Sequence, residues 1–224
     1  KIKYSPKKYA KDTNSNSKIR VKINNIEALK SIINLDVDMI YYEDVATLEQ
    51  AMAMAAANNK KLIYSAPRIV RNIEKSNEYC KENVQISALG QVKYYKENSE
   101  NVSFDVDYYL NPFNSETINH YKKEGATTVC ISQELNIHEI KETTKYTDME
   151  IETVAYGYIP MMLSEYCPMG VVARSCKKDK RCATCKESKY VLRDFKGEEY
   201  RISQDLFCRS TIYNSIANCL INNL

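Results

Sequence analysis

The segment MIYYEDVATLEQAMAMAAANNKKLIYS, residues 39–65, decides the fold. It begins with a short β-rich run, Met39–Tyr42, and ends with another, Leu62–Ser65. The stretch between them, Ala46–Ala57, consists mostly of strong helix formers and predicts a helix. Two strands joined through a single helix cannot form a hairpin, so they need a crossover connection and become parallel. The segment therefore predicts a β/α protein with a parallel sheet.

The same alternation of β-rich runs and helical stretches extends from residue 18 to about residue 156. Seven β-rich runs are predicted in all: Ile19–Ile23, Met39–Tyr42, Leu62–Ser65, Val84–Ala88, Val102–Leu110, Thr127–Ile131 and Met149–Tyr156. An open, doubly wound sheet is a competing solution, but the chain has five glycines and no G-x-G-x-x-G phosphate turn. We therefore expect a TIM-like (β/α) barrel that is incomplete, because a closed barrel has eight strands.

Segments of different character flank the predicted barrel domain, residues 18–156. Residues 1–17 form a polar, lysine-rich linker that lacks an initiator Met, so we expect the N-terminal part of a longer parent protein to be missing. Residues 157–224 form a small cysteine-rich appendix. Within it, residues 190–203 predict a β-hairpin around a Lys-Gly turn, and Arg209–Leu220 predicts a short helix.

Composition excludes several classes of protein. The 224 residues include 32 basic and 29 acidic side chains, and 44% are hydrophobic, which is typical of a folded globular protein and excludes general disorder. No apolar run reaches the roughly 18 residues that a membrane-spanning helix needs, so we expect no membrane association. A disulfide scaffold is typical of small secreted chains, and we therefore expect reduced thiols and a cytoplasmic location.

Six of the eight cysteines fall in the last 58 residues and predict a metal centre. Thiolates bind soft metals, and a C-x-x-C pair such as Cys182 and Cys185 lets two of them reach one ion from a tight turn. Cys167 and Cys208 complete the predicted set, with Cys176 as a substitute. A [4Fe–4S] cluster and a zinc ion both accept four thiolates, so spacing leaves the two open. The others are expected to be ordinary core thiols: Cys80, Cys130 and Cys219.

At these residues the chain resembles a known family. The run AYGYIPMMLSEYCPMG (155–170) and the run YVLRDFKGEEYRISQDLFCRSTIYNS (190–215) resemble the C-terminal part of peptidase family U32, the collagenase-like peptidases. Two earlier runs, DYYLNPFNS (107–115) and SQELN (132–136), resemble barrel segments of the same family. The resemblance covers residues 18–219 and is greatest to the later portion of long bacterial members.

The resemblance implies a TIM-barrel-like fold and a redox activity. Although family members are called peptidases, relatives carry out oxygen-independent hydroxylation of a nucleobase in ribosomal or transfer RNA, or of a quinone precursor. Those relatives hold an iron–sulfur cluster on four cysteines. By position Cys167, one or both of Cys182 and Cys185, and Cys208 match the ligands. Some relatives have a cysteine where this chain has Pro160, so Cys176 is a possible replacement.

The residues themselves favour hydroxylation over proteolysis. There is no G-x-S-x-G motif and no H-E-x-x-H motif, and the two histidines, His120 and His138, fall in helical stretches. A true peptidase is the alternative, and a non-catalytic module with structural zinc is a further one. Residues 174–189 hold seven basic and two acidic side chains, a candidate RNA contact. Candidate catalytic residues follow predicted strands or adjoin Cys167: Glu43, Arg68, Asn111 and Glu165.

Overall fold

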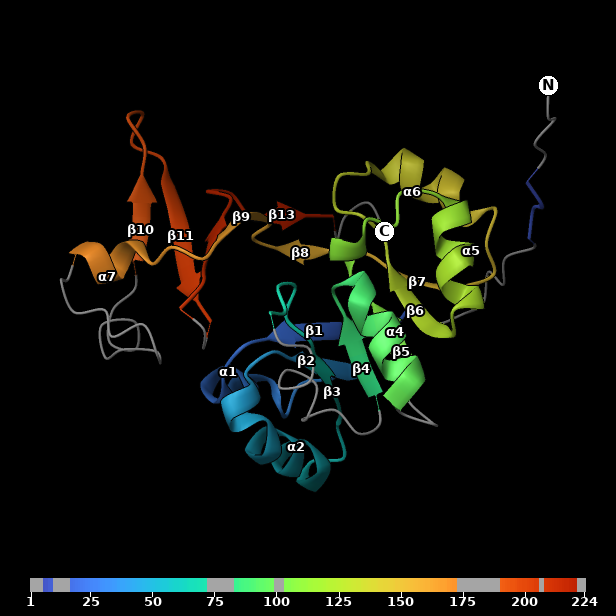
Figure 1. Ribbon diagram of the computed structural model, residues 1–224, viewed down its shortest axis with the longest axis horizontal. Helices are drawn as coiled ribbons and strands as arrows, with labels where there is room; N and C mark the ends of the chain where they lie inside the picture. Colours follow the sequence, from blue (N-terminus) through green and yellow to red (C-terminus); the bar gives the residue numbers. More distant parts are fainter. Residues whose placement is uncertain are drawn as a thin grey trace. The chain divides into compact units, whose positions relative to one another are not determined.

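The computed structural model describes residues 6–9, 17–71, 83–98, 103–172, 190–205 and 208–220. The chain divides into two compact units, Lys1–Thr153 and Val154–Leu224 (Figure 1). The first unit holds a parallel β/α sheet and the second holds antiparallel strands, so each is described by itself.

The first unit is built on a seven-stranded sheet whose strands follow one another in chain order, and every neighbouring pair is parallel. The strands are β1 (Arg20–Ile23), β2 (Met39–Tyr42), β3 (Lys61–Ser65), β4 (Asn83–Ile86), β5 (Ser103–Val106), β6 (Ala126–Cys130) and β7 (Glu150–Glu152). This order is that of a (β/α) barrel lacking one strand. The prediction of an incomplete TIM-like barrel sheet is confirmed.

Helices connect consecutive strands as crossover connections do, except between β3 and β4, where residues 72–82 lie outside the described part of the chain. They are α1 (Ile26–Ile32), η1 (Val45–Thr47), α2 (Leu48–Ala57), α4 (Leu89–Asn98), η2 (Tyr108–Leu110), α5 (Ser115–Lys123) and α6 (Ile137–Thr144). Several begin at an asparagine whose side chain accepts backbone N–H groups of the first turn: Asn25, Asn114 and Asn136. These caps satisfy donors that have no partner within the helix, which fixes where each helix starts.

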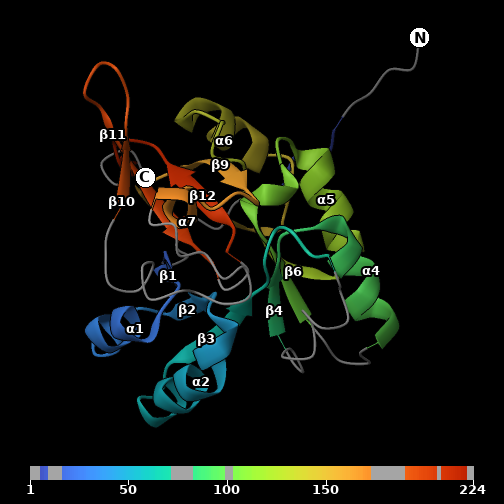
Figure 2. The same ribbon diagram turned by 60° about the vertical axis from the view of Figure 1, so that its left-hand side comes forward.

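The two faces of this sheet differ in chemistry. Side chains such as Ile40, Val84 and Val106 form one apolar core with the helices, and α2, α4 and α5 pack against β3, β4 and β6 (Figures 1 and 2). Because side chains alternate along a strand, the intervening residues share the opposite face. That inner face is largely polar: the Ser65 hydroxyl donates to Gln85 Oε1 across 2.7 Å, for example. A largely polar inner face is unusual, because barrel interiors are commonly filled with branched apolar side chains.

The sheet curls until its two edge strands are within side-chain reach of each other. In a flat sheet, six strand spacings would separate β1 from β7 by about 29 Å. Instead, Arg20 on β1 donates hydrogen bonds to Glu150 and Glu152 on β7. The sheet order shows no backbone pairing between β1 and β7 among the described residues, so side chains bridge the gap where an eighth strand would lie.

The second unit is antiparallel. A four-stranded sheet has the order β10–β11–β12–β9, and β8 pairs with β13. Its elements are β8 (Tyr156–Gly157), β9 (Pro160–Ser164), α7 (Pro168–Val172), β10 (Tyr190–Arg193), β11 (Glu199–Gln204), β12 (Ser210–Tyr213) and β13 (Asn218–Cys219). The hairpin predicted at 190–203 is present as β10 and β11, and its turn residue Gly197 has a φ of 88° that favours glycine.

The helix predicted over Arg209–Leu220 is wrong, because these residues form β12 and β13. Thr211, Ile212 and Tyr213 favour strands, and β12 gains backbone partners from both β11 and β9. An isolated helix of about 12 residues is only marginally stable, so this tertiary pairing decides the outcome. Cys219 accordingly lies on β13 and is exposed, so the expectation of a core thiol is wrong for this residue.

None of the helices within the described residues combines the length and the apolar character that crossing a bilayer requires.

Candidate functional site

A cluster of charged and polar side chains occupies the carboxyl ends of the barrel strands. Lys22, near the end of β1, donates from Nζ to Asp107 Oδ2 across 2.7 Å. The Ser87 hydroxyl, one residue after β4, donates to the same oxygen across 3.0 Å. Glu43, one residue after β2, lies 3.4 Å from Lys22 Nζ. In (β/α) barrels this end of the strands carries the active site, so these four residues are termed the mouth cluster.

Asp107 is the most buried member of the mouth cluster, with 1% of its side chain exposed. It follows β5 directly, and its backbone N–H donates to Ile86 O on the neighbouring strand. Its second carboxylate oxygen, Oδ1, is buried, and no donor among the described residues reaches it. Leaving such an oxygen without a donor costs about 1–3 kcal/mol or more. A buried acceptor of this kind calls for a partner, which a water molecule, an ion or a ligand can provide.

Aromatic and basic side chains lie beside the mouth cluster. Tyr108 and Tyr109 follow Asp107 in the short helix η2, and their ring centroids are 4.4 Å apart. Lys22 Nζ lies 5.7 and 5.8 Å from the two ring centroids. The exposed Arg68 places its guanidinium 4.8 Å from the centroid of the Tyr109 ring. Beside the buried carboxylate of the mouth cluster there are therefore two aromatic rings and an exposed cation.

Electrostatics keep Lys22 charged and the neighbouring Tyr108 and Tyr109 neutral. Burial alone would lower the pKa of Lys22, but the carboxylates of Asp107 and Glu43 outweigh it and hold that pKa above its ordinary value. Burial, with the charge of Asp107 next in importance, raises the pKa of Tyr108, and burial also raises the pKa of Tyr109. The tyrosines therefore act as neutral donors or stacking surfaces at neutral pH.

Cys130 ends β6 on the same inner face and is buried. Burial, reinforced by the charges of Asp107 and Glu152, raises the pKa of its thiol well above the ordinary value. A thiol that stays protonated is a poor nucleophile, which agrees with the expectation of an ordinary core thiol.

A second interior cluster lies further from the carboxyl ends of the strands and is centred on Arg20. The guanidinium donates to Tyr41 Oη across 2.9 Å and to Glu152, and it lies 3.7 Å from Asp105. The Tyr41 hydroxyl is within hydrogen-bond distance of both Asp105 and Glu152, at 2.9 and 2.7 Å. Four strands, β1, β2, β5 and β7, are joined through these side chains. The contacts of Arg20 with Glu152 link the two edge strands, β1 and β7.

The four predicted catalytic candidates are placed differently by the structure. Glu43 pairs with Lys22, and Arg68 lies over Tyr109, so both belong to the mouth region. Asn111 is exposed and ends η2 in the left-handed conformation, with a φ of 51°, which gives it a turn-forming role. Glu165 is exposed and lies in the second unit. The sequence does not locate Lys22 or Asp107, although two aspartates in the otherwise apolar run FDVD were an available signal.

Two of the predicted metal ligands are described. Ser164 on β9 pairs with Ser210 on β12 in antiparallel register, so Cys167 and Cys208 both lie just past the same end of this ladder. The Gly170 N–H in the first turn of α7 donates to Cys167 Sγ across 3.3 Å. This arrangement fits two ligands of one metal centre. Among the described residues no group of three or more potential ligands converges. Cys176, Cys182, Cys185 and the segment 174–189 lie outside the described residues.

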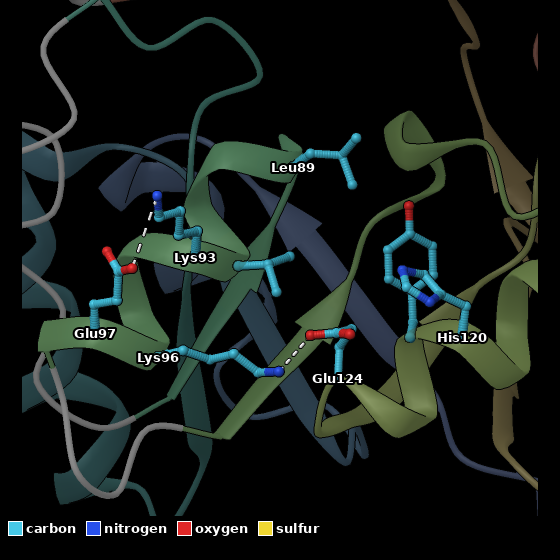
Figure 3. Close-up of a pocket in the computed structure, with 8 residues that line it drawn as sticks. Leu89, Lys93, Lys96, Glu97, His120 and Glu124 are labelled. Carbon is cyan, nitrogen blue, oxygen red and sulfur yellow. Dashed lines mark hydrogen bonds and ion pairs between the residues drawn. The ribbon is translucent and has the colours of Figure 1, made fainter.

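A separate hollow of about 320 Å³ lies between α4 and α5, on the outer layer of the first unit (Figure 3). Its charged side chains are already paired, Lys96 with Glu124 and Lys93 with Glu97. His120 lines it but faces no nucleophile among the residues drawn. Because its charges neutralise one another, this hollow is a weaker candidate than the mouth cluster.

The curled parallel sheet, with polar groups at the carboxyl ends of its strands, places the first unit among (β/α)-barrel-like proteins. The chain belongs to peptidase family U32, whose family model matches residues 42–223. It is 30% identical over 101 residues to tRNA hydroxylation protein P of Haemophilus influenzae. That match covers 45% of this chain and 22% of the relative, so the chain spans about a fifth of that protein's length.

Among solved structures, the U32 peptidase Mk0906 has a similar fold. The TM-score is 0.54 at 11% identity, with 67% of this chain and 73% of that chain covered. At this identity the likeness concerns the fold.

Proposed function

We propose that this chain is part of an iron–sulfur enzyme that hydroxylates a nucleobase in transfer or ribosomal RNA without molecular oxygen. The observation that carries the proposal is the similarity to a tRNA hydroxylation protein in a chain of family U32. The mouth cluster supports it, because a buried carboxylate beside a lysine and two tyrosines is suited to hold a polar, planar ring. The enzyme would act in the cytoplasm, where its RNA substrates are found.

The cofactor of the proposed enzyme is a [4Fe–4S] cluster held by Cys167, Cys182, Cys185 and Cys208, with Cys176 as a substitute ligand. The support within the described residues is the β9–β12 register and the Gly170 N–H at Cys167 Sγ. A bound cluster supplies electron-transfer chemistry that protein side chains lack. Zinc at the same thiols is the alternative, and would make the second unit a structural module.

The side chains of this chain have other tasks in the proposed reaction. Asp107 and Lys22 bind and orient the substrate ring, and Tyr108 and Tyr109 cover it and reduce the access of water. The basic segment 174–189 contacts RNA phosphates, so binding weakens steeply with salt. Of these residues, Lys22 stays charged and Tyr108 stays neutral near neutral pH, because the pKa of each is raised.

The peptidase reading has less support than hydroxylation. His120 and His138 lie on the outer helices α5 and α6, and Cys130 is a buried thiol with a raised pKa. A hydrolytic site needs a nucleophile within hydrogen-bond distance of a base. Among the described residues, His120, His138 and Cys130 form no such pair of nucleophile and base.

Anaerobic purification with metal analysis tests the proposal. We expect a brown protein with iron and acid-labile sulfide, and loss of both in Cys167→Ser and Cys208→Ser. Cys219→Ser is the matched control. Cys219 is exposed on β13 and is not a ligand in our proposal, so this variant should retain the cluster. Mass spectrometry of RNA from a deletion strain complemented with each variant then tests hydroxylation. Colourless protein with stoichiometric zinc contradicts the cluster, and protein cleavage that survives both ligand replacements favours the peptidase.

A further inference from the structure

We propose that Asp205 is a positioning residue for the metal centre: together with Arg209, it holds the backbone at Cys208 in the conformation from which Cys208 binds the metal. The inference rests on the proposed function, from which it takes Cys208 as a ligand. It adds the residues that make this ligand available, and it applies to a cluster and to a zinc ion alike.

The backbone at Cys208 has an unusual conformation. Its φ of 59° lies in the left-handed region, which residues other than glycine seldom adopt. The other non-glycine residues with a positive φ in the described part of the chain are Asn59 and Asn111, and asparagine tolerates this region. A cysteine in this conformation is strained, and such strain persists only where the surrounding structure enforces it.

The contacts that enforce this conformation converge on Asp205, which directly follows β11. The Cys208 N–H donates to Asp205 O across 3.2 Å, and the Arg209 N–H donates to Asp205 Oδ1 across 2.9 Å. The Asp205 N–H donates in turn to Arg209 O across 3.0 Å. Backbone groups of Cys208 and of the residue after it are thus fixed to one aspartate.

The side chain of Arg209 strengthens this connection. Its Nε donates to Asp205 Oδ2, and 8% of the Arg209 side chain is exposed, against 37% for Asp205. A guanidinium that is buried to this extent needs an anionic partner. Because Asp205 meets both the backbone and the side chain of Arg209, replacing Asp205 should release the backbone on both sides of the strained residue.

The buried residues of the second unit also lie beside the candidate ligands. Within the described part of that unit they are Met169, Gly170, Arg209 and Ser210. The first two shortly follow Cys167, and the last two directly follow Cys208. Gln204 links the two groups, because its Nε2 donates to Met169 Sδ and to Ser210 Oγ, each across 3.4 Å. The most ordered packing of this unit is therefore found next to its two described candidate ligands.

Cobalt(II) binding to the purified full chain tests the inference. The chain is stripped of metal by chelation and titrated with cobalt(II) under anaerobic conditions, and bound cobalt is measured by elemental analysis. Thiolates that bind cobalt(II) give a charge-transfer absorption, so the absorption per bound cobalt reports how many thiolates bind it. Cys208→Ser should lower this value by the contribution of one thiolate.

Asp205→Ala should lower the absorption per bound cobalt to the value of Cys208→Ser. It should also weaken cobalt binding by about tenfold to a hundredfold, the range for replacing a residue that orients a metal ligand. A general loss of stability would reduce the amount of cobalt bound and leave the absorption per bound cobalt unchanged. The absorption therefore distinguishes the loss of one ligand from a purely structural effect.

Asp194→Ala is the matched control. Asp194 Oδ1 also accepts backbone N–H groups in a turn of the second unit, those of Lys196 and Glu198, but no candidate ligand lies in that turn. This variant should bind cobalt like the wild type. Arg209→Met is a second test variant that removes the buried charge and leaves Asp205 partly exposed, so it does not depend on the folding of Asp205→Ala. It should weaken cobalt binding about tenfold, at the lower end of the same range.

Wild-type absorption per bound cobalt in Asp205→Ala overturns the inference, and so does an unchanged cobalt affinity in Arg209→Met. The absence of cobalt–thiolate absorption in the wild-type chain overturns it as well. The two proposals fail separately. Loss of one thiolate in Asp205→Ala, in a chain that does not hydroxylate RNA, defeats the proposed function alone. A hydroxylase whose Asp205→Ala variant keeps every thiolate on the metal defeats this inference alone.

Discussion

At the scale of single residues, the mouth cluster is centred on a largely buried ion pair between Asp107 and Lys22. Asp107 is almost completely buried, and Lys22 neutralises it at 2.7 Å. Removing one partner of a buried ion pair leaves the other charge without compensation, which costs more than the pair itself contributes. The pair is therefore a point where stability and ligand binding depend on the same atoms.

We predict that Lys22→Met lowers the free energy of unfolding by about 3 kcal/mol, at the lower end of the range for buried pairs because Lys22 keeps some exposure. Urea denaturation followed by circular dichroism measures it. Lys122→Met is the matched control, since Lys122 and Asp148 form an exposed pair, and it should unfold close to the wild type. The double variant Lys22→Met/Asp107→Asn should recover part of the loss. Equal stability of the Lys22 and Lys122 variants would contradict the burial argument.

At the scale of elements, β1 and β7 are edge strands that side chains connect. Arg20 reaches Glu150 and Glu152 on β7 and lies near Asp105 on β5. Burial of Glu152 raises the pKa of its carboxyl group, an effect that outweighs its hydrogen bond from Tyr41 and the charge of Arg20. The curl of the sheet thus buries carboxylates at a cost in desolvation. The single guanidinium of Arg20 offsets this cost by pairing with several of them.

We predict that Arg20→Met lowers the free energy of unfolding by about 3–5 kcal/mol, because it leaves Asp105 and Glu152 without their cation. Hydrogen exchange read by mass spectrometry should show faster exchange in β1 and β7 than in β3 and β4. Arg193→Met serves as the control: Arg193 pairs with Glu199 on the exposed β10–β11 hairpin and should change neither measurement. Equally faster hydrogen exchange in all seven strands would contradict this prediction. It would show that Arg20 stabilises the first unit as a whole and not the contact between its edge strands.

The second unit shows where element prediction from sequence succeeds and where it fails. The β10–β11 hairpin is local, since its two strands and its turn are contiguous, and the sequence predicts it correctly. The strand β12 is not local: its partner β9 lies about fifty residues earlier in the chain. A short segment with mixed propensity takes the conformation that such distant partners impose, and the predicted helix over Arg209–Leu220 fails for this reason.

At the scale of the whole molecule, the two units bury apolar surface very unequally. Among the described residues the first unit has an extended apolar core, whereas Met169 is the buried apolar side chain of the second. Many large apolar side chains are exposed in the second unit, Phe195 at 94% and Val172 at 81% among them. Such a unit gains little stability from burial, so the proposed metal centre would contribute much of its order.

We predict that removing the metal loosens the second unit and leaves the first unchanged. Hydrogen exchange of the anaerobically purified protein, before and after chelation, should show lost protection in β9, β11 and β12 and unaltered protection in β2–β5. The free energy of metal binding becomes folding energy where the site is absent in the unfolded chain, which is the reason for this difference. Cys219→Ser should respond to chelation like the wild type. Protection of β9–β12 that survives complete metal loss would contradict the prediction.

The sequence by itself determined the parallel order of the first unit. Strand and helix alternate in the chain, and strands joined by crossover connections lie parallel in the sheet. It also indicated the tail cysteines as candidate ligands and placed Glu43 and Arg68 near the ends of their strands. All of these follow from local patterns, which physical chemistry links directly to backbone conformation.

Only the tertiary structure decided which side chains meet. Lys22 and Asp107 are 85 residues apart, and Arg20 and Glu152 are 132 apart, so no local pattern relates them. Their pairing depends on the curl of the sheet, which turns alternate residues of distant strands into one interior. A buried charge is tolerated only beside its partner, and that partner is defined by folding in three dimensions.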